Sequence, residues 1–200
     1  WTLTQGRARM VTRWAAQQGA EGRRLEVLTI GVQDGIIEGA MLEACPRLHL
    51  TVCDVAPQAN RGIEELRQRF PGRVETHVVK LNHCDWFPPT PELFDAILLF
   101  EVLEHLPNPG HALRQIYDHL RPNVQFFLST PIASRWVEPY LADLKDPRPW
   151  WHVHAQNPTS LWNLVWSRGF TGTLCAVEKE DLFLGTFTTA PKAAEQARRD

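Results

Sequence analysis

The amino-acid sequence predicts an α/β fold: a doubly wound domain with a seven-stranded, mostly parallel sheet and helices on its faces. Three observations support this prediction. Apolar runs without polar alternation are typical of strands buried on both faces, as in parallel sheets. Five such runs alternate with helical segments along the chain. The last two runs are joined by the short turn at residues 178–181, which predicts a hairpin and therefore one antiparallel strand.

The first half of the chain alternates helix and strand. Residues 2–18 form an amphipathic helix that we expect to cover the sheet. The helices after the first two strands are predicted at residues 36–45 and 57–70. Pro57 suits the first turn of the second of these, and Pro71-Gly72 ends it. The predicted strands of this half lie at residues 25–32, 48–55, 75–81 and 94–100.

The second half continues the pattern. Asn108 is the predicted cap of the next helix, Pro109 opens it, and Arg121-Pro122 closes it. A further helix is expected from Asn157-Pro158 to Arg168-Gly169, and residues 132–144 are a candidate short helix. The remaining strands are predicted at residues 124–129, 170–177 and 182–189.

Length and composition favour one domain over residues 1–200, with a helix inside residues 1–22 and a lid-like Pro/Trp/His loop at 142–157. The net charge is −2 without a basic block, which argues against nucleic-acid or anionic-lipid partners. No apolar run approaches the roughly 18 residues of a membrane helix. The four cysteines form no CxxC pair, which favours a reducing, cytoplasmic setting. Because the chain opens on Trp1, we keep open that it belongs to a longer, multidomain protein.

Two turns predict a nucleoside ligand. The turn from Gly31 to Gly35 follows the first strand and leads into a helix, whose amino end offers free N–H groups. Asp54 ends the second strand, about 20 residues further on, where a carboxylate can accept both hydroxyls of a ribose. The two features in this order favour a ligand that spans both strand ends.

A polar cluster follows the fourth strand directly. The segment FDAILLFEVLEHL ends its apolar run at Phe100 and continues with Glu101, Glu104 and His105. Open α/β sheets bind ligands at the carboxyl ends of such strands. We therefore expect this cluster to take part in chemistry.

These motifs resemble those of the class I S-adenosylmethionine-dependent methyltransferases, and the resemblance covers nearly the whole chain. Gly31 and Gly35 match the outer glycines of the family's first motif, and the segment Val52–Val55 matches the second. The run EVLEHL at residues 101–106 is the closest match, and it is typical of small-molecule methyltransferases. The resemblance implies a Rossmann-like domain and an S-adenosyl-L-methionine cofactor.

The resemblance also assigns roles to residues. Asp54 would bind the ribose and Val55 would pack on the adenine, with Asp85 and Trp86 contacting the ring from the next loop. Phe100 and Glu101 would also line the cofactor. Two positions depart from the family: Thr29 stands where an acid usually partners the cofactor's ammonium group, and Gln33 replaces the middle glycine.

For the reaction we expect methyl transfer to oxygen on a small-molecule or saccharide acceptor, because a histidine base suits a hydroxyl acceptor. The candidate bases are His105, His152 and His154, with Glu101 beside the first. Trp136, Trp150 and Trp151 suggest a flat or sugar-like acceptor surface.

Two alternatives stay open. Thr29 and Gln33 are compatible with a degenerate binding or scaffold domain that has lost catalysis. Glu101, Glu104 and His105, joined by His152 or His154, resemble the metal site of methyltransferases that act on the 3′ end of small RNAs. Because that pattern also occurs in metal-free relatives, no metal ligand is assigned.

Overall fold

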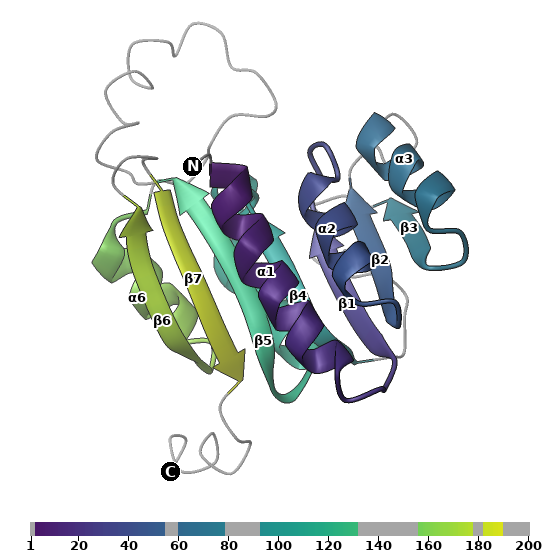
Figure 1. Ribbon diagram of the computed structural model, residues 1–200. Coiled ribbons are helices and arrows are strands. Elements are labelled where there is room, and N and C mark those ends of the chain that lie inside the picture. Colours follow the sequence, from purple (N-terminus) through teal and green to yellow (C-terminus); the bar gives the residue numbers. More distant parts are fainter. Residues whose placement is uncertain (1–2, 55–59, 79–92, 132–155, 178–181, 190–200) are drawn as a thin grey trace, which may run out of the picture. The chain divides into compact units, whose positions relative to one another are not determined.

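The computed structural model describes residues 3–54, 60–78, 93–131, 156–177 and 182–189. Their strands form a seven-stranded sheet in the order β3-β2-β1-β4-β5-β7-β6 (Figure 1). β1 pairs with β2 and β2 with β3 in parallel, whereas β7 pairs antiparallel with both β5 and β6. The predicted α/β fold, with a mostly parallel sheet and one antiparallel hairpin strand, is therefore confirmed.

Residue contacts divide the chain into two compact units, Trp1–Leu98 and Leu99–Asp200. The strand β4 (Phe94–Phe100) crosses from one to the other. Each unit is described by itself below.

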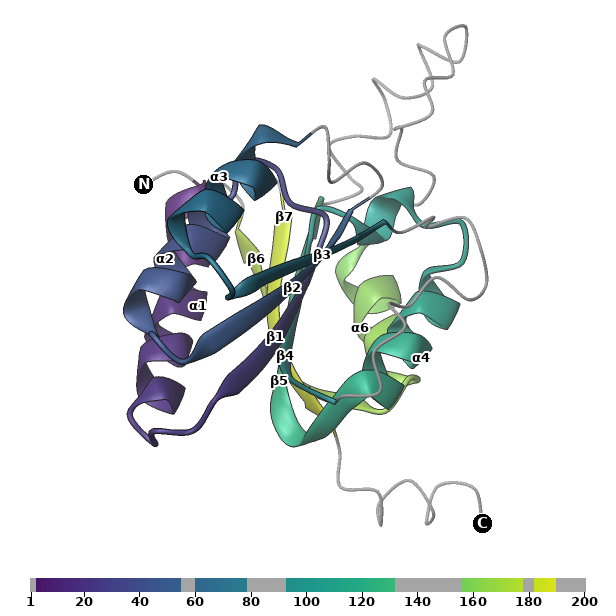
Figure 2. The same ribbon diagram turned by 90° about the vertical axis from the view of Figure 1, so that its right-hand side faces the viewer.

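The described residues of the first unit form three helices, three strands and most of β4. Its elements are α1 (Leu3–Gly19), β1 (Leu25–Ile30), α2 (Ile36–Ala44), β2 (Leu48–Asp54), α3 (Arg61–Arg69) and β3 (Val74–Val78). Figure 2 shows the three helices on the same side of β1, β2 and β3. Apolar side chains of α2 and α3, among them Met41 and Ile63, are buried together with those of β1 and β2. The β1–β2 register sets Ile30 opposite Cys53, so the two strands end side by side.

The second unit contains η2 (Leu103–His105), α4 (Pro109–His119), β5 (Leu120–Pro131), α6 (Pro158–Trp166), β6 (Phe170–Val177) and β7 (Leu182–Thr189). The helices α4 and α6 lie on one side of its strands (Figure 2). Aromatic rings hold the elements together: Phe126 lies 4.9 Å from Phe170 and 6.1 Å from Phe187 between ring centroids. Tyr117 of α4 contacts Phe170 edge-on at 5.4 Å.

Several predicted boundaries need correction. The first strand stops at Ile30, because Gly31 turns the backbone into the left-handed region with φ 74°. The helix α3 begins at Arg61 after its cap Asn60, later than predicted, and Pro57 lies outside the described residues. Pro122 does not close a helix: α4 ends at His119 and Pro122 lies inside β5. The predicted short helix at 132–144 lies outside the described residues.

The cysteines within the described ranges are free thiols: Cys45 and Cys53 are buried, and Cys175 is exposed. Burial raises the pKa of the Cys53 thiol to about 12, which leaves it protonated and unreactive near neutral pH. No helix in the described part of the chain has the length and apolar character needed to cross a membrane.

Candidate functional site

The carboxyl ends of β1 and β2 meet at the turn formed by residues 31–35. The Gly31 N–H donates to the Cys53 carbonyl at 2.8 Å, which continues the strand pairing into the turn. The Val32 N–H donates to Asp54 Oδ2 at 3.2 Å. The half-buried Asp54 carboxylate is therefore fixed beside the glycine turn.

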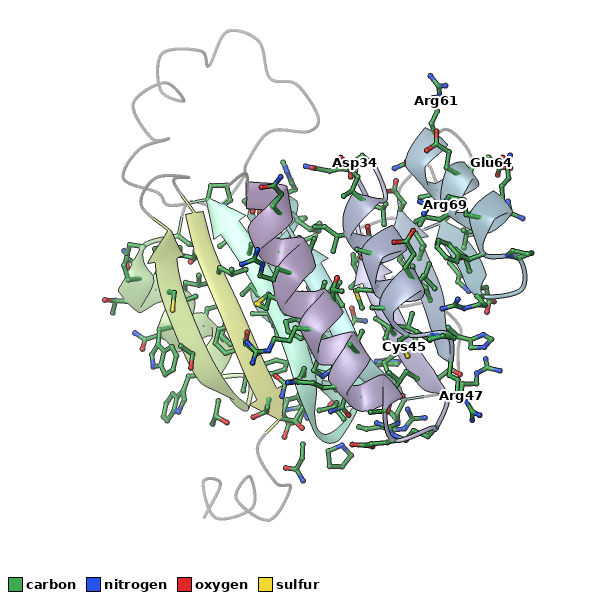
Figure 3. The ribbon with its side chains drawn as sticks, viewed as in Figure 1. Asp34, Cys45, Arg47, Arg61, Glu64 and Arg69 are labelled. Atoms are coloured by element: carbon green, nitrogen blue, oxygen red, sulfur yellow. The ribbon has the colours of Figure 1, made fainter. Side chains whose placement is uncertain are left out.

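The end of the turn packs tightly on the start of α3. Gly35 caps α2 with φ 74°, and a Cβ built on it would lie 3.0 Å from the Gly62 carbonyl oxygen. A Cβ on Gly62 would lie 2.4 Å from the backbone carbon of Asp34. Figure 3 shows Asp34 at the start of α2 and Arg61 at the start of α3. The amino ends of two helices are thus next to the turn, and both favour negative ligand groups.

Asn60 connects the turn to α3. Its amide oxygen accepts from the Ile63 N–H at 3.3 Å, which caps the helix, and its Nδ2 donates to the Val32 carbonyl. Sequence analysis missed this residue, although an Asn before an amphipathic segment is a recognised helix-start signal.

Thr29 and Glu38 form a buried polar pair directly beneath the turn. The Thr29 hydroxyl donates to Glu38 Oε1 at 3.0 Å, and the two residues are 1% and 5% exposed. Burial raises the pKa of Glu38 above its ordinary value of 4.5. The hydrogen bonds from its own backbone and from Thr29 oppose this rise, and the charge of Asp34 adds to it. Glu38 was not predicted; the signal available was an acid inside the apolar helix segment IIEGAMLEA.

The second unit contains the other predicted cluster. Glu101 follows β4 with φ 54°, a left-handed conformation that is rare for residues other than glycine and that concentrates at functional sites. It exchanges two hydrogen bonds with Ser129 of β5: its N–H donates to the Ser129 carbonyl at 3.0 Å, and the Ser129 hydroxyl donates to Glu101 Oε1 at 2.9 Å. The strained residue is therefore held by the adjacent strand.

Glu104 and His105 lie on the short helix η2. Glu104 is 1% exposed and accepts from the Thr130 hydroxyl at 3.1 Å. Its Oε1 lies 3.8 Å from Nε2 of His105, whose side chain is 31% exposed. A partly exposed imidazole beside a buried carboxylate is suited to accept a proton from a substrate hydroxyl.

The predicted site residues thus fall into three groups. Gly31, Gly35 and Asp54 come together in the first unit. Glu101 and His105 lie close in sequence in the second unit, after the buried Phe100. The third group lies outside the described residues: Val55, Asp85, Trp86 and His154.

A metal centre finds no support in the described residues. None of their His, Cys, Asp and Glu side chains gather in a group of three or more that could hold an ion. His152 and His154, the additional ligands of that alternative, lie outside the described ranges.

The chain belongs to a family of methyltransferases: residues 5–174 match the family model for a methyltransferase domain. Class I S-adenosylmethionine-dependent methyltransferases are among the solved structures that share its fold, so the resemblance seen in the sequence is confirmed.

Two curated relatives match about half of this chain. The ubiquinone biosynthesis O-methyltransferase of Aeromonas salmonicida is 31% identical over 112 residues, covering 56% of this chain and 44% of that protein. The enzyme of the same description from Pseudomonas putida is 32% identical over 105 residues, covering 52% and 44%. The chain therefore spans less than half the length of these relatives.

Among solved structures, the N-methyltransferase NodS from Bradyrhizobium japonicum WM9 matches with a TM-score of 0.61 at 21% identity, covering 93% of this chain and 98% of that one. NodS in complex with S-adenosyl-l-homocysteine matches with a TM-score of 0.60 at 20% identity, covering 90% and 87%. The mitomycin 7-O-methyltransferase MmcR matches with a TM-score of 0.63 at 18% identity, covering 90% and 54%. These identities show a shared fold only.

Proposed function

We propose that this chain transfers a methyl group from S-adenosylmethionine to an oxygen atom of a small-molecule or saccharide acceptor. The observation that carries the proposal is the hydrogen bond from Val32 N–H to Asp54, because it fixes a carboxylate beside a glycine turn and a helix amino end. The O-methyltransferase descriptions of the curated relatives support oxygen as the acceptor atom.

The residues of the turn fit this cofactor. Gly31 and Gly35 both have φ 74°, a conformation that glycine adopts without strain. Because neither residue has a side chain, a ligand can approach the backbone closely at both positions. Gln33, which departs from the family pattern, is exposed. Asp54 offers the acceptor oxygens that a ribose diol requires.

When bound, S-adenosylmethionine supplies an electrophilic methyl group on a sulfonium. The protein then has to orient the acceptor, exclude water and remove one proton. We assign the role of proton acceptor to Nε2 of His105, which lies 3.8 Å from the Glu104 carboxylate. The bonds from Ser129 and Thr130 fix Glu101 and Glu104 in turn.

The first test is calorimetric titration of the chain with S-adenosylmethionine and S-adenosylhomocysteine. We expect micromolar binding that Asp54→Ala weakens at least tenfold, because the substitution removes the ribose acceptor. The matched control is Asp118→Ala, which removes an exposed acid on α4 that pairs with Arg114 and should leave the affinity unchanged.

A folded wild-type chain that binds neither ligand would contradict the proposal. In that case the degenerate scaffold interpretation, which rests on Thr29 and Gln33, would be preferred.

A further inference from the structure

The helix α2 carries two carboxylates in opposite settings. Glu43 is 60% exposed and pairs with Arg69 of α3. Glu38 is 5% exposed and lies against β1, where Thr29 donates to it at 3.0 Å. A surface acid needs no explanation, whereas a buried one costs free energy unless its environment compensates for the charge.

The described residues compensate for the Glu38 charge only in part. A carboxylate has room for about four hydrogen bonds, and no Lys or Arg within the described ranges forms an ion pair with this one. The charge of Asp34, which acts on this carboxylate, is negative as well. The pKa of Glu38 is raised, and this is the direction expected for a buried carboxylate that has no cation beside it in the described residues.

A purely local role does not account for Glu38 either. It stands three residues after the cap Gly35, where an acid commonly accepts from the capping residue's N–H. Its carboxylate instead turns back to Thr29, the next-to-last residue of β1, and so lies at the base of the glycine turn.

We propose that Glu38, held by Thr29, is the anion that binds the ammonium group of the cofactor's amino-acid portion. The inference rests on the proposed function, because it needs a ligand seated on the turn at residues 31–35. S-adenosylmethionine carries a ribose diol in its nucleoside portion and an α-ammonium in its amino-acid portion. Asp54 matches the first group, and Glu38 is the buried negative charge next to the same turn that matches the second. Glu38 therefore selects ligands that have an amino group.

The test compares two ligands that differ in the amino-acid portion. S-adenosylhomocysteine has the ammonium, and 5′-methylthioadenosine keeps the adenosine and the sulfur without it. In calorimetric titrations we expect Glu38→Gln to weaken S-adenosylhomocysteine binding at least tenfold and to leave 5′-methylthioadenosine binding unchanged. Glu43→Gln, which removes the exposed acid of the same helix, should change neither affinity.

A second variant distinguishes loss of ammonium binding from loss of folding. Exchanging the pair, with Thr29→Asp and Glu38→Thr in one chain, moves the carboxylate from the helix to the strand and should restore the wild-type ratio of the two affinities. Thermal unfolding confirms that each variant is folded.

The outcomes are distinct. If Glu38→Gln weakens both ligands equally, or leaves S-adenosylhomocysteine binding intact, the inference is wrong although the proposed function stands. If the wild-type chain binds neither ligand, the proposed function fails and the inference with it.

Discussion

At the scale of a single residue, Asn60 performs two tasks with two different atoms. Its Oδ1 caps α3, and its Nδ2 donates to the Val32 carbonyl of the glycine turn. Asn60→Ala removes both, and we expect a loss of about 1 kcal/mol in the free energy of unfolding together with weaker S-adenosylhomocysteine binding.

Asn60→Asp separates the two tasks, because a carboxylate still accepts from the Ile63 N–H but cannot donate to Val32. We expect urea unfolding close to wild type and an affinity reduced about tenfold, since the turn loses its anchor. Equal affinities for Asn60→Asp and wild type would show that the bond to Val32 does not shape the cofactor site.

The sequence locates residues whose position follows from the backbone pattern and misses residues whose position depends on packing. Gly31 follows the end of β1 and Asp54 ends β2, and these strand ends follow from the apolar runs. Glu38 is separated from Thr29 by a turn and a helix start, and only the fold shows that its carboxylate returns to β1. The sequence shows Thr29 in place of an acid, but it does not show the hydrogen bond of Thr29 to Glu38.

At the scale of elements, the contact between the turn and α3 depends on a glycine. A Cβ on Gly62 would lie 2.4 Å from the Asp34 backbone carbon, a distance that forces the turn and the helix apart. We expect Gly62→Ala to cost about 1 to 3 kcal/mol of stability and to weaken S-adenosylhomocysteine binding.

The matched control is Gly6→Ala in α1, where a Cβ meets nothing within 4 Å. That substitution should stabilise the chain by about 0.5 to 1 kcal/mol through helix propensity and leave the affinity unchanged. A destabilisation common to both variants would refute the close contact as the cause.

At the scale of elements, the sequence predicted the starts of helices accurately where a capping Asn and a following Pro mark them. Asn108 and Asn157 cap their helices and Pro stands at the first turn of each, as the sequence indicated. β4, β6 and β7 have the predicted bounds. The position of β7 between β5 and β6 was not predicted, because strand order depends on pairing partners far apart in the chain.

At the scale of the whole molecule, the buried Glu38 makes the free energy of unfolding depend on pH. Its pKa in the folded chain is raised above 4.5, chiefly by burial and also by the charge of Asp34. Between 4.5 and the folded value, the folded chain holds a proton that the unfolded chain has released, so stability falls as the pH rises. The contribution of Glu38 is fully present below pH 4.5 and is lost as the pH rises through the folded pKa.

The difference between wild type and Glu38→Gln isolates this effect, because all other titrating groups are shared. We expect the stability of the wild type relative to the variant, from urea unfolding at several pH values, to decrease above pH 4.5 with a slope approaching about 1.4 kcal/mol per pH unit, and then to level off. Saturating S-adenosylhomocysteine should shrink this decrease, because a bound ammonium favours the ionised carboxylate in the folded chain. A difference that does not vary with pH would mean that Glu38 titrates alike in both states, and the burial argument behind its proposed role would then lose its support.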